Sequence, residues 1–115
     1  MDNKVKISIL LETYGNLLTD KQYNLLDDYY NSDLSLSEIA ENEGITRQAV
    51  RDNLKKGENK LFEYEEKLGL MRKRIMQEEQ IANILSEISK INSKSSDKEI
   101  ADVLEDVKNK LNCLV

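Results

Sequence analysis

The residues best suited to chemistry are cations near the middle of the chain. Arg47, Arg51 and Lys55 follow one another at intervals of four residues, so in a helix they form one row. Residues 46–60 include five basic and two acidic residues, although the chain of 115 residues has a formal net charge of −5. Arg and Gln can read base edges, while Thr and Lys can hold phosphates. The pattern predicts contact with DNA or RNA, the alternative being a merely solvated face. The candidate contact residues are Thr46, Arg47, Gln48, Arg51, Lys55 and Lys56.

Two short helices joined by a tight turn are predicted to position these cations. Ser35 and a glutamate three residues later form a capping box for the first helix, and Thr46 caps the second. Gly44 can adopt the positive φ that the turn between them requires. Val50 and Leu54 are predicted to face the core, which leaves the cations on the opposite side. Together these features indicate a helix-turn-helix.

The composition predicts an all-α protein. Apolar residues make up 39% of the chain and charged residues 34%, and proline is absent. Ahead of the helix-turn-helix, apolar spacing predicts a helix over residues 3–16, and Thr19 with Gln22 forms a capping box for the next helix. The length allows a helix-turn-helix domain over 1–68, followed by a helical hairpin over 69–115.

The second helix of the motif is predicted to be long. Its apolar positions step by four and three residues, which is the spacing of a heptad seam that a partner helix could cover. The seam consists of Val50, Leu54, Gly57, Leu61, Tyr64 and Leu68. Gly69 indicates an end to this helix, because glycine favours the left-handed conformation of a helix C-terminus. The alternative is a helix that continues into the next segment, since one interior glycine costs only about 1 kcal/mol.

The C-terminal segment is predicted to form two amphipathic helices. Residues 92–95 form the predicted loop, and Ser96 with Glu99 forms a capping box for the last helix. Two apolar stripes on so small a hairpin need further cover. The hairpin is therefore expected to pack on the first domain or on a second copy, and a homodimer through the long helix or the hairpin is predicted.

Several tyrosines could stack on unpaired bases, but their helical spacing favours packing with the hydroxyl at the surface. These tyrosines are Tyr14, Tyr23, Tyr29 and Tyr30.

No catalytic or metal-binding pattern is present in the sequence. Histidine is absent, no glycine-rich phosphate loop exists, and adjacent carboxylates on a helix diverge. The single cysteine, Cys113, cannot form an intrachain disulfide and is expected to be a small buried or half-buried residue. No stretch is long and apolar enough for a membrane span or a signal peptide. The sequence predicts a cytoplasmic protein that is not an enzyme and has no cofactor and no membrane association.

Two resemblances accompany these patterns. The sequence from Leu17 to Leu61 resembles the fourth conserved region of σ70-type factors, the helix-turn-helix that reads promoter −35 elements. The pieces LLTDKQ, YY, SLSEIAE, RQAV and YEEKL are similar to the YlxM-like helix-turn-helix family. The latter resemblance implies a role in the signal recognition particle pathway, and the σ-like segment implies DNA binding.

The resulting hypothesis is a nucleic-acid-binding regulator of the protein-targeting system, with DNA or structured RNA as its partner. Thr46 would hold a phosphate, and Gln48 and Arg51 would meet base edges. Backbone contacts would come from Arg47, Lys55 and Lys56. The alternative is an adaptor that binds the signal recognition particle's protein or RNA and uses the helix-turn-helix only as a packing unit. The excess negative charge in residues 1–34, with six acids and three bases, favours that alternative.

Overall fold

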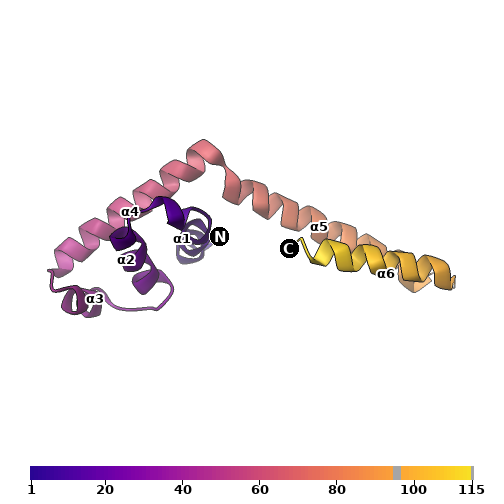
Figure 1. The fold of residues 1–115 in the computed structure, drawn as a ribbon, viewed down its shortest axis with the longest axis horizontal. Helices are drawn as coiled ribbons and strands as arrows, with labels where there is room; N and C mark the ends of the chain where they lie inside the picture. The colour runs from indigo at the N-terminus through magenta and orange to yellow at the C-terminus, as the bar shows by residue number, and fades with distance from the viewer. Residues whose placement is uncertain (95–96, 115) are drawn as a thin grey trace. The chain divides into compact units, whose positions relative to one another are not determined.

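The computed structural model describes residues 1–94 and 97–114, and every regular element in them is helical (Figure 1). The predicted all-α class is therefore confirmed. In chain order the elements are α1 (Asn3–Tyr14), the 3₁₀ turn η1 (Gly15–Leu17), α2 (Asp20–Tyr30), α3 (Leu36–Glu43), α4 (Arg47–Leu68), α5 (Leu70–Lys94) and α6 (Lys98–Asn112).

The chain divides into two compact units, one from Met1 to Met71 and the other from Arg72 onward. In the first unit α4 is the central element, because α1, α2 and α3 all pack against it. Their apolar faces meet in one core. Its fully buried side chains are Ile7, Leu10, Leu11, Tyr14, Leu25, Leu26, Ile39, Val50 and Leu61. The division after residue 68 and the docking of the hairpin stay predictions.

The helix ends in the first unit follow local hydrogen-bonding rules in most places. Thr19 and Gln22 form the predicted capping box at the start of α2. The prediction that the first helix reaches residue 16 was wrong, since α1 ends at Tyr14 and η1 follows. Tyr23 of α2 packs so closely on Gly15 that an added Cβ would lie 2.7 Å from its ring, so only glycine fits at this position without a shift of the ring.

The predicted seam of α4 is covered largely by the protein's own helices. Val50, Leu54, Gly57 and Leu61 are buried, and Leu26 of α2 lies over Gly57, where a Cβ would come within 2.8 Å of its Cδ1 atom. Leu68, the last residue of the predicted seam, is 55% exposed. The buried part of the seam therefore stabilises this unit and is not free for a second chain.

A buried polar cluster holds the end of α4 and the start of α5 together. Gly69 adopts a left-handed φ of 63° and ends α4 as predicted. The Glu65 carboxylate accepts hydrogen bonds from the Tyr14 hydroxyl (2.7 Å) and from the Met71 amide (2.9 Å). The Tyr14 oxygen accepts a further bond from the Leu70 amide (3.0 Å). The phenol thus satisfies both a buried carboxylate and an amide of a helix N-terminus.

Tyr14→Phe is expected to lower the free energy of unfolding by about 1–3 kcal/mol, because the buried Glu65 loses a donor and the Leu70 amide loses its acceptor. Urea unfolding monitored by circular dichroism measures the change. Tyr23→Phe is the control, since 38% of that side chain is exposed. Equal unfolding midpoints for the two variants would show that the cluster contributes nothing.

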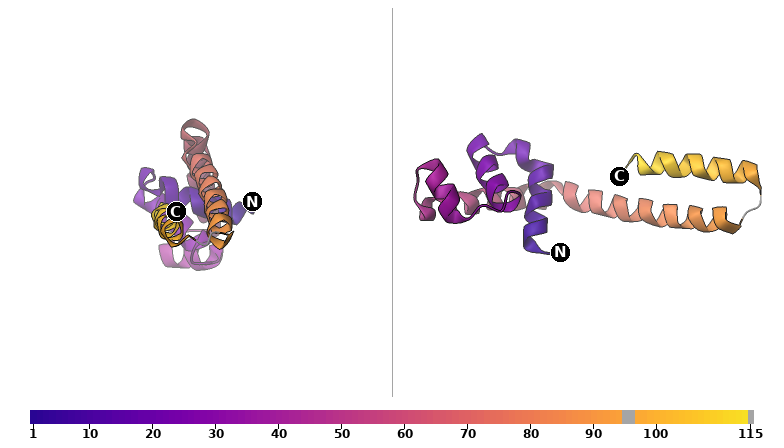
Figure 2. Two further views of the ribbon diagram at one scale, coloured as in Figure 1. Left: turned by 90° about the vertical axis from the view of Figure 1, so that its right-hand side faces the viewer. Right: turned by 90° about the horizontal axis from the view of Figure 1, so that it is seen from below.

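In the second unit α6 runs antiparallel to α5, as the hairpin prediction requires (Figure 2). The loop prediction was wrong for residues 92–94, because α5 continues to Lys94, and residue 95 lies outside the described residues. The described cap of α6 is Asp97, whose carboxylate accepts hydrogen bonds from the amides of Glu99 (2.9 Å) and Ile100 (3.5 Å). Asp97, not Ser96, is therefore the N-cap, and Ser96 itself lies outside the described residues.

The hairpin buries little of its apolar surface. Of the side chains described in α5 beyond Met71 and in α6, only Ile88 is buried. Large apolar side chains remain exposed along both helices, among them Met76, Ile84, Ile91, Ile100, Val103 and Val107. Cys113 is also exposed, which corrects the expectation of a buried or half-buried residue.

Candidate nucleic-acid interface

The helix-turn-helix has the local geometry that its sequence predicts. The Ser35 hydroxyl accepts a hydrogen bond from the Glu38 amide (3.1 Å), and the Glu38 carboxylate accepts one from the Ser35 amide (3.2 Å). Gly44 follows α3 with a φ of 66°. The Thr46 hydroxyl then accepts a bond from the amide of Ala49 (3.0 Å) and caps α4. These caps fix where α3 and α4 begin.

Burial of one face of α4 decides which way its cations point. Val50 is fully buried and Leu54 is 4% exposed. The three cations of the predicted row, Arg47, Arg51 and Lys55, are all exposed. None of the three makes a hydrogen bond or an ion pair to another residue described by the structure. Their positive charges are therefore available to an external anion.

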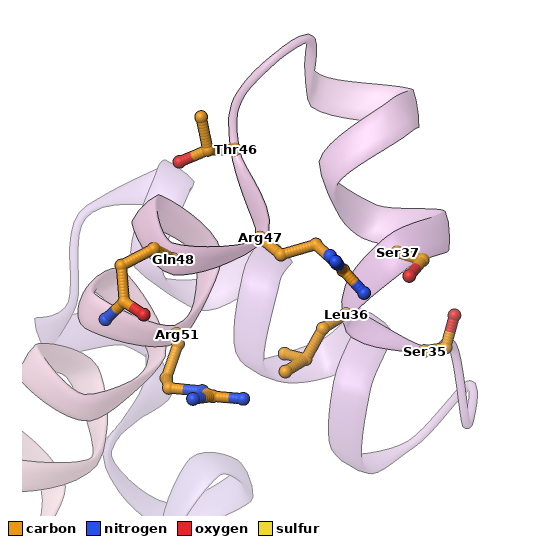
Figure 3. A pocket seen from close by; sticks show the side chains of 7 residues that line it. All are labelled: Ser35, Leu36, Ser37, Thr46, Arg47, Gln48 and Arg51. Carbon is orange, nitrogen blue, oxygen red and sulfur yellow. The ribbon is translucent and has the colours of Figure 1, made fainter.

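The first turns of α3 and α4 line one open pocket (Figure 3). Its lining residues are Ser35, Leu36, Ser37, Thr46, Arg47, Gln48 and Arg51. The guanidinium groups of Arg47 and Arg51 extend toward the α3 side of this pocket, whereas the Gln48 side chain points away from it (Figure 3). Two helix N-termini and two arginines thus border the same opening, a combination that favours a phosphate group.

Gln48 and Lys56 occupy different positions from the arginines. Gln48 donates a hydrogen bond from its amide nitrogen to the Asp52 carboxylate (2.9 Å), so one of its polar groups already has a partner. Lys56 is exposed and does not line this pocket, nor the neighbouring pocket that Lys55 lines further along α4. At about 100° per residue, it lies roughly 140° around the helix from Arg51. The structure therefore brings together Thr46, Arg47, Gln48 and Arg51 at the pocket, with Lys55 one turn further along.

Two parts of this surface were not included in the sequence prediction. Ser35 and Ser37 form the α3 wall of the pocket, and the signal for them is the capping box that places a helix start there. Beyond Arg51 a second pocket continues the surface toward Tyr29 and Tyr30 at the end of α2. No local spacing rule connects those tyrosines with α4.

The described residues contain no group of histidine, cysteine and acidic side chains that could hold a metal ion. A search of the described helices finds none with the length and apolarity needed to cross a bilayer.

The sequence matches known relatives over nearly its whole length. Residues 1–103 match the UPF0122 family, described as "Putative helix-turn-helix protein, YlxM / p13 like". A UPF0122 protein of Clostridium kluyveri is 49% identical over 109 residues, which is 95% of each chain. A UPF0122 protein of Acetivibrio thermocellus is 42% identical over all 115 residues and 98% of its own length. One from Clostridium acetobutylicum is 37% identical over 112 residues, or 97% of both chains. The chain belongs to the UPF0122 family of YlxM/p13-like helix-turn-helix proteins.

Proposed function

We propose that this protein is a non-enzymatic regulator that binds nucleic acid through the first turns of α3 and the exposed face of α4. The observation that carries the proposal is the pocket between the two helix starts, where Arg47 and Arg51 are exposed and have no partner among the described residues. Exposed, unpaired arginines close to helix N-termini provide strong, directional donors for phosphate oxygens.

The surrounding residues divide into two kinds of contact. The Thr46 hydroxyl, whose oxygen caps α4, still has a proton to donate to a phosphate at the pocket. Arg51 lies one turn further along α4 and would meet base edges, while Arg47, Lys55 and Lys56 would contact the backbone. Gln48 could read a base only by turning from Asp52, so its contribution is expected to be small. Duplex DNA and structured RNA both offer this chemistry.

Acidic side chains limit how tightly the protein can hold any nucleic acid without sequence preference. The net charge is −5, and Asp52 lies on α4 itself. Because non-specific affinity comes from phosphate neutralisation, and the salt dependence grows with the number of phosphates contacted, binding through a few well-placed cations should weaken only moderately with salt. The site is therefore expected to recognise a defined target in the cytoplasm.

Substitution of Lys55 tests the proposal through the salt dependence of binding. In vitro selection from random DNA and RNA pools supplies a target, and its affinity is measured between 50 and 200 mM salt. Lys55→Ala should reduce the slope of log K against log salt by about one. It should also lower the affinity for all sequences by the same factor. Lys60 is an exposed cation on the opposite side of the same helix from Arg51. Lys60→Ala should therefore leave the slope unchanged. Failure to select any target at low salt would contradict the proposal.

A second candidate function is an adaptor in the signal recognition particle pathway, to which the family resemblance points. The observation that favours it is the exposed apolar face of α6, where Ile100, Val103 and Leu104 line a shallow pocket. Such a face suits a protein partner or a second copy of the chain, as in the predicted homodimer. Val103→Asp, on this α6 face, separates the functions: an adaptor would lose capture of the particle's protein and keep any nucleic-acid binding, whereas charge reversal at Arg51 should do the opposite.

A further inference from the structure

A second pocket places two aromatic rings beside the cations of α4. It lies between the end of α2, the start of α3 and the middle of α4. The residues that line it are Tyr29, Tyr30, Leu36, Arg51, Leu54, Lys55 and Glu58. Both tyrosines are half-buried, unlike Tyr14, which is enclosed in the core. Aromatic side chains next to lysine and arginine are the combination that binds unpaired bases and their phosphates.

The two rings are held in place before any ligand arrives. Their centroids lie 5.0 Å apart with an interplanar angle of 89°, an edge-to-face contact. The Tyr30 hydroxyl also donates a hydrogen bond to the Glu58 carboxylate of α4. Burial and this bond raise the pKa of the Tyr30 hydroxyl above its ordinary value, so it remains a donor at neutral pH. Fixed rings lose little conformational freedom when a base binds, and this lowers the cost of stacking.

The tyrosine pocket is continuous with the phosphate pocket of the proposed interface. Leu36 and Arg51 line both pockets. A strand whose phosphate is held by Arg47 and Arg51 would thus have an adjacent nucleotide next to the rings, with Lys55 on the same side. Inside a perfect duplex that base is stacked between its neighbours and cannot enter. A base in a bulge, a loop or a strand end can leave the stack and do so.

We propose that the pocket of Tyr29, Tyr30, Arg51 and Lys55 holds one unpaired nucleobase together with its phosphate. This inference rests on the proposed nucleic-acid binding and adds the class of target: a helical segment interrupted or ended by an unpaired nucleotide. The tyrosine rings and the cations could bind an unpaired nucleotide of either RNA or DNA. The experiment below distinguishes the two nucleic acids.

The test compares matched short hairpins, made in RNA and in DNA, with and without a single bulged 2-aminopurine. Full-length protein should bind the bulged hairpin roughly 5- to 150-fold more tightly than the perfect one, as expected for stacking of one base. Binding should also quench the 2-aminopurine fluorescence. A preference seen in only one of the two backbones identifies the natural source.

Substitutions at Tyr29 locate the stacking surface. Tyr29→Leu should abolish the preference for the bulged hairpin over the perfect one, whereas Tyr29→Phe should keep that preference. Tyr23→Leu, on the same helix but absent from the pocket, is the control for altered packing of α2. If Tyr29→Leu does not fold, as judged by circular dichroism, quenching by wild type and Tyr29→Phe decides the question.

The possible failures differ in what they overturn. Equal affinity for bulged and perfect hairpins, or unquenched fluorescence in the complex, overturns the unpaired-base pocket and leaves the proposed function standing. An unchanged bulge preference in folded Tyr29→Leu overturns the assignment to this pocket. Absence of binding to every hairpin at low salt overturns the unpaired-base pocket, whereas the proposed function is overturned only if selection from random pools also yields no target.

Discussion

Arg51→Ala is expected to weaken binding to the selected target by about 1–3 kcal/mol and to relax sequence preference. The reason is that Arg51 lines both the phosphate pocket and the tyrosine pocket, which no other cation named in either lining does. Its guanidinium is exposed and has no partner among the described residues, so removing it changes no internal contact that would alter folding. The effect is measured by fluorescence anisotropy with the target and with a scrambled sequence of the same length.

The comparison variant for this prediction is Lys60→Ala, which removes the same charge from the far side of α4. If binding came only from general electrostatic attraction, the two variants would lose the same affinity, since both lower the net positive charge of the helix by one. The proposed interface requires a much larger loss for Arg51→Ala, confined to the preferred target. Equal losses on both sequences would contradict a specific role for Arg51.

Leu61→Ala is expected to lower the free energy of unfolding by about 2–5 kcal/mol. Leu61 is fully buried where α4 meets the other helices of its unit, and truncation would leave a cavity that a close-packed core cannot readily fill. Urea denaturation at several protein concentrations gives the free energy, and the slope with denaturant shows whether unfolding remains two-state.

The control is Leu68→Ala, seven residues further along the same predicted seam. Because Leu68 is 55% exposed, its truncation should change the free energy of unfolding by no more than about 0.5 kcal/mol. If the entire seam instead formed a coiled coil between two chains, both variants would be strongly destabilised and unfolding would depend on protein concentration. Comparable losses at the two positions would therefore show that α4 packs mainly between copies.

Features that depend on residues three or four apart could be predicted from the sequence. The capping boxes at Thr19 and Ser35, the turn at Gly44 and the inward placement of Val50 all belong to this class. Each is decided by hydrogen bonds or packing within one or two turns of helix, where the chain itself brings the groups together. The exposure of the cation row follows from the same periodicity.

Features that depend on distant parts of the chain could not be predicted. Glu65 is buried because Tyr14, 51 residues earlier, donates a hydrogen bond to it, and a charged residue in a helix otherwise indicates solvent. The neighbourhood of Tyr29 and Arg51 likewise arises from the packing of α2 against α4. The end of α5 is a different case. Asn92 and Ser93 are residue types that favour turns, yet the helix continues to Lys94, since propensity is only a weak local preference.

Backbone amide chemical shifts recorded during titration with the selected nucleic acid would locate the binding surface residue by residue. A chain of 13.3 kDa is small enough for each amide to be followed. If the proposed interface binds, the largest shifts occur from Ser35 to Ser37 and from Thr46 to Lys55, while amides of α6 stay unchanged. Shifts confined to α5 and α6, with the starts of α3 and α4 unaffected at saturation, would contradict it.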